Sequence, residues 1–199
     1  MFKVNNGNTK LGKSIKVINV PAGITCKCDA PCNKKGVCYA QKGSFNYPSV
    51  KNCYAENLRT FIENPEQAEM DILSQMPFIG FCRVHASGDI VNPRYLDMLV
   101  SIAIKLPNVK FMMYTKKYEL INKYVEEIGE FPENMTIIFS AWDGYKMDNR
   151  HNFPTSHVIL KKGNEDAIPE NGFLCNGECE RCYKCWLLEK GESVLFNEH

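Results

Sequence analysis

Two groups of cysteines, one near each end of the chain, constrain the fold more than any other feature. Four of the ten cysteines lie between positions 26 and 38, and four lie between positions 175 and 185. Only Cys53 and Cys82 stand apart from these groups. The groups therefore form either two separate ligand sets or one site assembled from both ends of the chain.

The rest of the sequence indicates where such a protein would reside. The N-terminus lacks the apolar segment of a signal peptide, and no stretch reaches the roughly 18 apolar residues of a spanning helix. We therefore expect a cytoplasmic protein without a membrane partner, where reducing thiol pools favour metal binding or thiol chemistry over disulfides. The formal net charge of +1 gives no global attraction for nucleic acid.

The C-terminal group is compact, with the pattern Cys175-x3-Cys179-x2-Cys182-x2-Cys185. A zinc ribbon usually separates its two cysteine pairs by roughly 12 to 20 residues. The Cys-x2-Cys-x2-Cys part instead has the spacing that places three thiolates on three corners of a four-iron cluster. The spacing favours a 4Fe-4S cluster here and leaves zinc as the alternative.

The N-terminal group is looser, with the pattern Cys26-x-Cys28-x3-Cys32-x5-Cys38. It follows the first predicted strand, where loops of an α/β protein often carry function. Three cysteines would leave one iron of a four-iron cluster open to a small molecule, whereas four would close it. Both arrangements stay open, so one or two clusters are expected in the chain.

Strand and helix patterns alternate between the cysteine groups. Strands are predicted at 14–20, 79–86, 109–115, 135–142 and 157–160, with helices starting near Pro48, Asn64-Pro65, Asn92-Pro93 and Leu120. This order predicts an α/β fold with about five mainly parallel strands, arranged as a partial (β/α) barrel or as a doubly wound sheet. We expect a barrel domain at 1–170 and a cysteine-rich segment at 171–199.

Chemically reactive residues follow the carboxyl ends of these strands, so we expect them on one rim together with both cysteine groups. Candidates for catalysis are Arg83, His85, Lys116 and Asp143. Candidates for binding a cofactor are Tyr39, Ser87, Gly88, Asp89, Tyr114, Thr115 and Trp142. Strand alternation predicts that Arg83 and His85 point into the barrel; a core histidine and a simple helix-capping turn at Ser87-Gly88-Asp89 are the alternatives.

Several blocks resemble the phage-encoded gene-product-88-like family. The matching residues are Gly23-Ile24-Thr25-Cys26, Cys32, Cys38-Tyr39-Ala40, Val50, Tyr54, Asn57, Arg83 to Asp89, Phe111, Tyr114-Thr115-Lys116, Cys179, Cys182 and Cys185-Trp186. That family is similar to a shortened radical S-adenosylmethionine (radical SAM) enzyme. The resemblance implies a partial barrel, a three-cysteine 4Fe-4S cluster after the first strand, and the cytoplasm of the host cell. The usual x3-then-x2 cysteine motif is absent, and Asp89 stands where those enzymes have a Gly-Gly-Glu turn.

Three functions compete at this point. The first is a radical-SAM-like iron–sulfur enzyme that binds S-adenosylmethionine or another small molecule and takes electrons from a donor. The second is an iron–sulfur protein without catalysis, which passes electrons or uses its clusters as folding staples. The third is a zinc-stabilised binding module, which the near-neutral charge and the lack of a nucleic-acid-reading motif disfavour.

Overall fold

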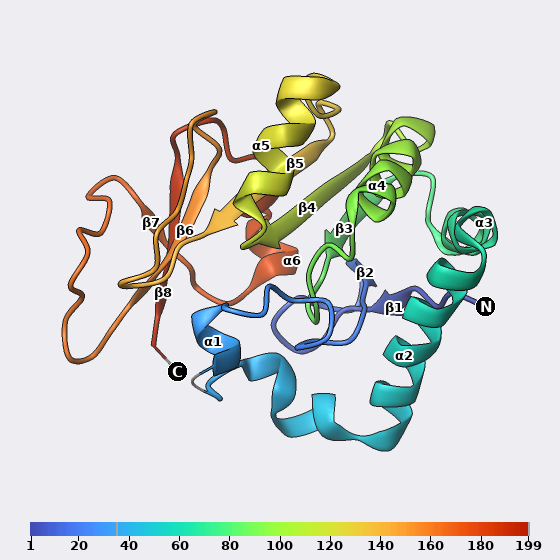
Figure 1. The fold of residues 1–199 in the computed structure, drawn as a ribbon, viewed down its shortest axis with the longest axis horizontal. Coiled ribbons are helices and arrows are strands. Elements are labelled where there is room, and N and C mark those ends of the chain that lie inside the picture. The colour runs from blue at the N-terminus through green and yellow to red at the C-terminus, as the bar shows by residue number, and fades with distance from the viewer. Residues whose placement is uncertain (35, 199) are drawn as a thin grey trace.

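One open sheet, mostly parallel, organises the chain in the computed structural model, which describes residues 1–34 and 36–198. Within these residues the sheet has eight strands in the order β1-β2-β3-β4-β5-β6-β8-β7 (Figure 1). Only the edge pair β1–β2 is antiparallel. The strands are β1 (Asn5–Asn6), β2 (Lys16–Ile18), β3 (Gly80–Val84), β4 (Val109–Thr115), β5 (Met135–Ser140), β6 (Thr155–Ile159), β7 (Phe173–Leu174) and β8 (Ser193–Asn197).

The α/β class and the mainly parallel sheet are confirmed, but about five strands was too low a number. The five predicted strands correspond to β2, β3, β4, β5 and β6. The three additional strands include β7 and β8, which come from the cysteine-rich segment 171–199 and join the sheet beside β6. The C-terminal segment is thus built into the same sheet as residues 1–170.

The four predicted helices begin at or close to the expected residues, and two short helices within the cysteine groups were not predicted. The α-helices are α1 (Pro31–Lys34), α2 (Pro48–Glu63), α3 (Pro65–Gln75), α4 (Pro93–Lys105), α5 (Tyr118–Glu127) and α6 (Cys179–Cys182), and the 3-10 turns are η1 (Tyr39–Gln41), η2 (Gly43–Asn46) and η3 (Lys184–Trp186). At the start of α3, Asn64 accepts a hydrogen bond from the backbone N–H of Gln67. Asn92 does the same for Tyr95 at the start of α4. Each cap precedes a proline, which suits the first helical position.

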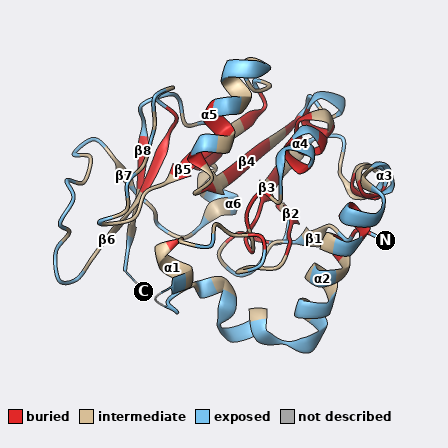
Figure 2. Cartoon of the chain, in the orientation of Figure 1, coloured by how far each residue is buried: buried red, intermediate tan, exposed pale blue. Residues whose placement is uncertain are grey.

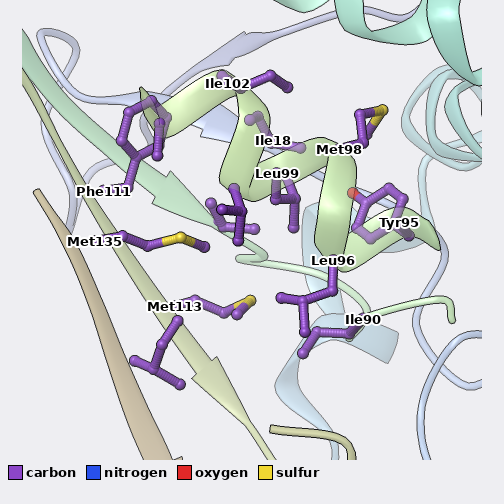
Figure 3. Close-up of a cluster of buried hydrophobic side chains, with 14 of the residues drawn as sticks. Ile18, Ile90, Tyr95, Leu96, Met98, Leu99, Ile102, Phe111, Met113 and Met135 are labelled. Carbon is purple, nitrogen blue, oxygen red and sulfur yellow. The ribbon is translucent and has the colours of Figure 1, made fainter. Parts of the chain in front are cut away.

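Helices α2 to α5 all pack on one face of the sheet. Each contributes buried side chains to one large core cluster, for example Phe61, Ile72, Leu99 and Ile121. Figure 3 shows apolar side chains of α4, among them Leu99, gathered with Phe111 and Met113 of β4. A doubly wound sheet would carry helices on both faces, so that alternative is not supported.

A second, smaller core covers the opposite face, which we call the inner face. It contains Val17, Met112, Ile138 and Val194 from the sheet together with Trp186 from η3. Figure 2 shows the central strands β4 and β5 as mostly buried. The C-terminal segment with α6 and η3 therefore does for the inner face what α2 to α5 do for the other. No helix in the described part of the chain is long and apolar enough to cross a membrane.

Candidate metal centre

The N-terminal cysteine loop follows β2 and is folded by short-range contacts. The hydroxyl of Thr25 donates to the carbonyl of Pro21 at 2.9 Å, and the backbone N–H of Gly23 donates to the sulfur of Cys26 at 3.4 Å. Gly23 has φ +85°, a conformation that favours glycine. This turn places Cys26 in the same loop as Cys32.

Three of the four cysteines in this loop are partly buried. The thiol of Cys38 donates a hydrogen bond to Cys32, and this bond, helped by the charge of Lys116 and opposed by burial, lowers the pKa of Cys32 to about 6. The same bond raises the pKa of Cys38. Burial raises the pKa of Cys26, with smaller contributions from Asp89 and Cys32. We call Cys26, Cys32 and Cys38 the thiol triad. The fourth cysteine, Cys28, is exposed.

Lys116 places a positive charge beside the thiol triad. It follows β4, and its Nζ donates to Oγ of Ser140 at the end of β5, at 2.8 Å. The same Nζ lies 5.7 Å from the centre of the Trp142 ring. Two of the predicted residues, Lys116 and Trp142, therefore meet near the thiol triad, and Ser140 joins them as a partner that the sequence analysis missed.

Asp89 also lies at this rim, but its carboxylate is occupied by the protein. One oxygen accepts from Thr115 Oγ1 at 2.7 Å and from the N–H of Ile90 at 2.8 Å, and the other accepts from the N–H of Lys116 at 3.1 Å. Burial raises the pKa of Asp89, and the hydrogen bond from Thr115 opposes that rise. In this structure Asp89 and Thr115 fasten the end of β3 to the end of β4.

Gly88 and Ser87 complete this turn and pack against the loop after β2. A Cβ added to Gly88 would lie 2.5 Å from Cγ2 of Val20 and 2.7 Å from its carbonyl oxygen. Ser87 is buried, and Asn19 accepts from its backbone N–H and from that of Ala86, both at 2.9 Å. Asn19 is another positioning residue that the sequence analysis missed, because a single asparagine at a strand end carries no local signal.

His85 does not point to the inner face as strand alternation predicts. Its φ is +67°, and this left-handed residue reverses the alternation beyond Val84. The ring stacks on Tyr95 of α4, and Nε2 lies 3.1 Å from the Tyr95 hydroxyl, on the helical side of the sheet. Ala86 consequently joins the inner core. The structure matches the alternative of a core histidine.

Arg83 does lie on the inner face, between the two cysteine groups. Its Nη2 donates to the hydroxyl of Tyr39 at 3.2 Å, and its guanidinium carbon lies 5.1 Å from the centre of the Tyr114 ring. Burial lowers the pKa of Arg83, but the nearby Tyr39, Tyr114, Cys179 and Cys185 outweigh it, so the pKa is raised. Tyr39 and Tyr114 thus belong to the same cluster as this arginine.

The C-terminal set comprises Cys175, Cys179, Cys182 and Cys185. Cys175 follows β7, and the chain then crosses the inner face through α6 and η3, so this group does not stay on the rim. Burial raises the pKa of Cys185 to about 11, with Cys175 and Cys179 adding to the rise and a hydrogen bond from Tyr114 opposing it. Burial likewise raises the pKa of Cys179, to which Cys175 and Cys182 contribute. All four thiols therefore occupy one neighbourhood.

Aromatic packing holds the C-terminal set in place. Nε1 of Trp186 donates to the carbonyl of Cys82 at 2.9 Å, and the Trp186 carbonyl accepts from Thr136 Oγ1 at 2.9 Å. The ring of Tyr183 stacks on Phe81 with centres 4.1 Å apart. Tyr183 adopts φ +51°, which lets the chain turn from α6 into η3. These contacts fix Cys182 and Cys185 on either side of the turn.

Asp143 serves a different purpose from the one expected. Its Oδ1 accepts from the N–H groups of Glu165 and Asp166 at 2.8 and 2.9 Å, and it therefore organises the loop after β6. Among the described contacts, none joins it to either cysteine group. Of the four catalytic candidates, Arg83 and Lys116 lie beside the cysteines, and His85 and Asp143 are engaged elsewhere.

Both cysteine groups supply sulfur donors, and thiolates are ligands for zinc and for iron–sulfur clusters alike. Within residues 1–34 and 36–198, no three His, Cys, Asp or Glu side chains converge closely enough to hold one metal ion. The donor set therefore fits either kind of centre by its chemistry.

Comparison with known proteins gives a family and nothing closer. No curated protein and no solved structure matches the chain. The family match extends from the N-terminal segment through both cysteine groups as far as Cys185. On this match over residues 2–185, the chain belongs to the family described as gene product 88.

Proposed function

We propose that this chain is an iron–sulfur protein of the radical SAM kind, with one cluster on the thiol triad and one on the C-terminal set. The observation that carries the proposal is the contrast within the N-terminal loop. Cys26, Cys32 and Cys38 are partly buried, while Cys28 is exposed. Three thiolates on a four-iron cluster leave one iron able to bind a small molecule.

The residues around the thiol triad suit an anionic or aromatic ligand. Lys116 offers its ammonium group, and the partly buried Trp142 offers a ring face beside it. Asp89 would act indirectly, because its hydrogen bonds to Thr115 and Lys116 position the strand ends that carry these groups. The cluster would supply electron transfer to the bound molecule, and the chain would orient that molecule and limit side reactions. An electron donor is part of this proposal.

The C-terminal set has the features of a closed centre without catalysis. Four cysteines are available, Cys185 is buried, and Trp186 is fixed in the inner core. A centre of this kind stabilises the fold or passes electrons to the thiol triad. The Cys-x2-Cys-x2-Cys spacing favours iron over zinc at this centre. The non-catalytic function considered above would then apply to the C-terminal centre alone.

Anaerobic purification followed by iron, sulfide and zinc analysis tests the proposal. We expect iron and sulfide in both the intact chain and the Cys53→Ala variant, because Cys53 lies apart on α2. Cys32→Ala should lose the cluster of the thiol triad while the C-terminal cluster remains. Zinc without sulfide in the intact chain, or equal iron loss in both variants, would refute the proposal.

The radical SAM part needs a separate measurement. The intact chain, reduced with dithionite, should bind S-adenosylmethionine and change the electron paramagnetic resonance (EPR) spectrum of one cluster. Cys32→Ala should abolish that change, while Cys28→Ala should retain it. If the EPR spectrum of the iron-loaded chain did not change with S-adenosylmethionine, the chain would still be an iron–sulfur protein, but binding of this cofactor would be rejected.

A further inference from the structure

Arg83 is unusual among the arginines in having no carboxylate partner. Across the described ranges 1–34 and 36–198, Arg59, Arg94, Arg150 and Arg181 each form an ion pair with Asp or Glu, and Arg83 does not. Its groups instead contact the Tyr39 hydroxyl, the Tyr114 ring and the carbonyl of His85. A partly buried cation without an opposite charge is costly, so a negative charge is expected nearby.

The C-terminal set is where that charge would arise. The guanidinium of Arg83 lies 5.1 Å from the centre of the Tyr114 ring, and Tyr114 packs with Cys175, Cys179 and Cys185 in the inner core. Thiols carry no charge until they ionise, but metal ligands are thiolates. Four thiolates on a cluster or an ion leave the whole centre negative, and that charge would lie beside the guanidinium.

We propose that Arg83 is the counter-charge of the metal centre on the C-terminal set, and that Tyr39 links it to the thiol triad. Tyr39 directly follows Cys38, so the hydrogen bond from Arg83 fixes the end of the N-terminal cysteine loop against the inner face. Arg83 is thus a positioning residue that serves both sites. This inference rests on the proposed function and adds to that function the group that joins the two centres.

Arg83→Met removes the charge and keeps an unbranched apolar side chain, and it is best tested with Cys32→Ala so that only the C-terminal centre is loaded. We expect this centre to hold its metal about 10-fold more weakly in a chelator challenge, the usual size of an outer-shell effect. Its midpoint potential should also shift to a more negative value, because a nearby cation stabilises the more negative reduced form. Arg83→Lys should recover part of both losses.

The matched control is Arg94→Met, which removes an exposed arginine paired with Glu66 at 2.8 Å. It should change neither the metal retention nor the potential. Circular dichroism of each variant shows whether the chain is folded, and Arg83→Lys keeps the test valid if Arg83→Met is not. If the Arg83→Met variant retained its metal as well as the protein with Arg83, and had the same midpoint potential, the proposed counter-charge role would be overturned.

The link to the thiol triad is tested by a double-mutant cycle on chains with all cysteines intact. Tyr39→Phe removes only the hydroxyl that accepts from Arg83. We expect each single change to alter the EPR spectrum of the thiol-triad cluster, and the double variant to differ little from either single one. Additive changes would overturn the link. An intact chain that binds no metal at all would instead refute the proposed function, a result separate from these.

Discussion

Nη2 of Arg83 lies 3.2 Å from the hydroxyl of Tyr39, although 44 positions separate the two residues. Arg83 belongs to the third strand, and Tyr39 ends the N-terminal cysteine loop. The same guanidinium lies 5.1 Å from the centre of the Tyr114 ring, and Tyr114 packs with Cys179 and Cys185 in the inner core. Arg83 therefore contacts one residue that follows the N-terminal cysteines and one that packs with the C-terminal cysteines.

The thiol triad makes a direct prediction about individual cysteines. Cys26→Ala should reduce the iron content of the intact chain by the equivalent of one cluster, because Cys26 is partly buried in the loop with Cys32 and Cys38. Cys28→Ala should leave the iron content unchanged, because Cys28 is exposed. Iron analysis of the two anaerobically purified variants checks this. If Cys28→Ala also lost one cluster, the loop would close on four thiolates.

Gly88 allows steric crowding to be separated from backbone strain. Gly88 and Gly163 have nearly the same φ, +86° and +85°, but an added Cβ meets nothing within 4 Å at Gly163. Gly163→Ala should therefore lower the free energy of unfolding by about 1 kcal/mol from strain alone. Gly88→Ala adds the clash with Val20 and should lose about 1–3 kcal/mol more. Urea unfolding of both variants measures the difference, and equal losses would show that the turn relaxes.

The comparison of sequence and structure shows which signals were local. The strand 109–115 was predicted with the bounds of β4, because apolar residues alternate there between two buried faces. β1 and β7 have two residues each, which is too short for an alternating pattern, and the five-residue β8 was missed as well. Their pairing depends on tertiary contacts, which local patterns do not contain.

The sequence identified the residue types at the candidate site but not the backbone angles that decide where their side chains point. Grouped thiols indicated the loops that hold Cys32 and Cys185 next to cations. The fate of His85 depends on φ +67°, which inverts the strand's faces and is not encoded by the alternation itself. Asp89 was recognised as important, but its saturation by Thr115 and backbone donors requires the neighbouring strand to be known.

His85 makes stability depend on pH. Burial, with help from Lys117 and Arg83, lowers its pKa from 6.5 to about 3. The folded chain therefore binds fewer protons than the unfolded chain between these values, and the stability present above pH 6.5 is lost as pH falls toward 3. The slope contributed by this one group reaches about 1.4 kcal/mol per pH unit.

His85→Asn removes this titration and still tolerates a left-handed residue, as Asn152 does at φ +56°. We expect the unfolding free energy of the variant to fall less steeply than that of the intact chain between pH 6.5 and 4.5. Chemical unfolding at several pH values measures the slopes. Parallel slopes would mean that His85 becomes charged without unfolding the site.

The last prediction concerns Cys175, which could complete the C-terminal centre or cross to the thiol triad. Its backbone N–H donates to the carbonyl of Leu195 at 2.8 Å, which fixes it at the end of β7. Burial is the largest cause of the raised pKa of Cys179 and of Cys185, and Cys175 adds to both. The pKa of Cys26 is raised by burial, Asp89 and Cys32. A compact run also closes a site at less entropic cost than a distant contact.

We therefore expect Cys175→Ala to lose or convert the C-terminal cluster alone. EPR spectra and iron counts of Cys175→Ala, with Cys53→Ala as the control, distinguish the two arrangements. An altered thiol-triad signal beside an intact C-terminal one would show that Cys175 crosses between the sites. In that case the N-terminal cluster would have four protein ligands and no open iron. Both the proposed binding of a small molecule there and the assignment of Cys175 to the C-terminal centre would then be wrong.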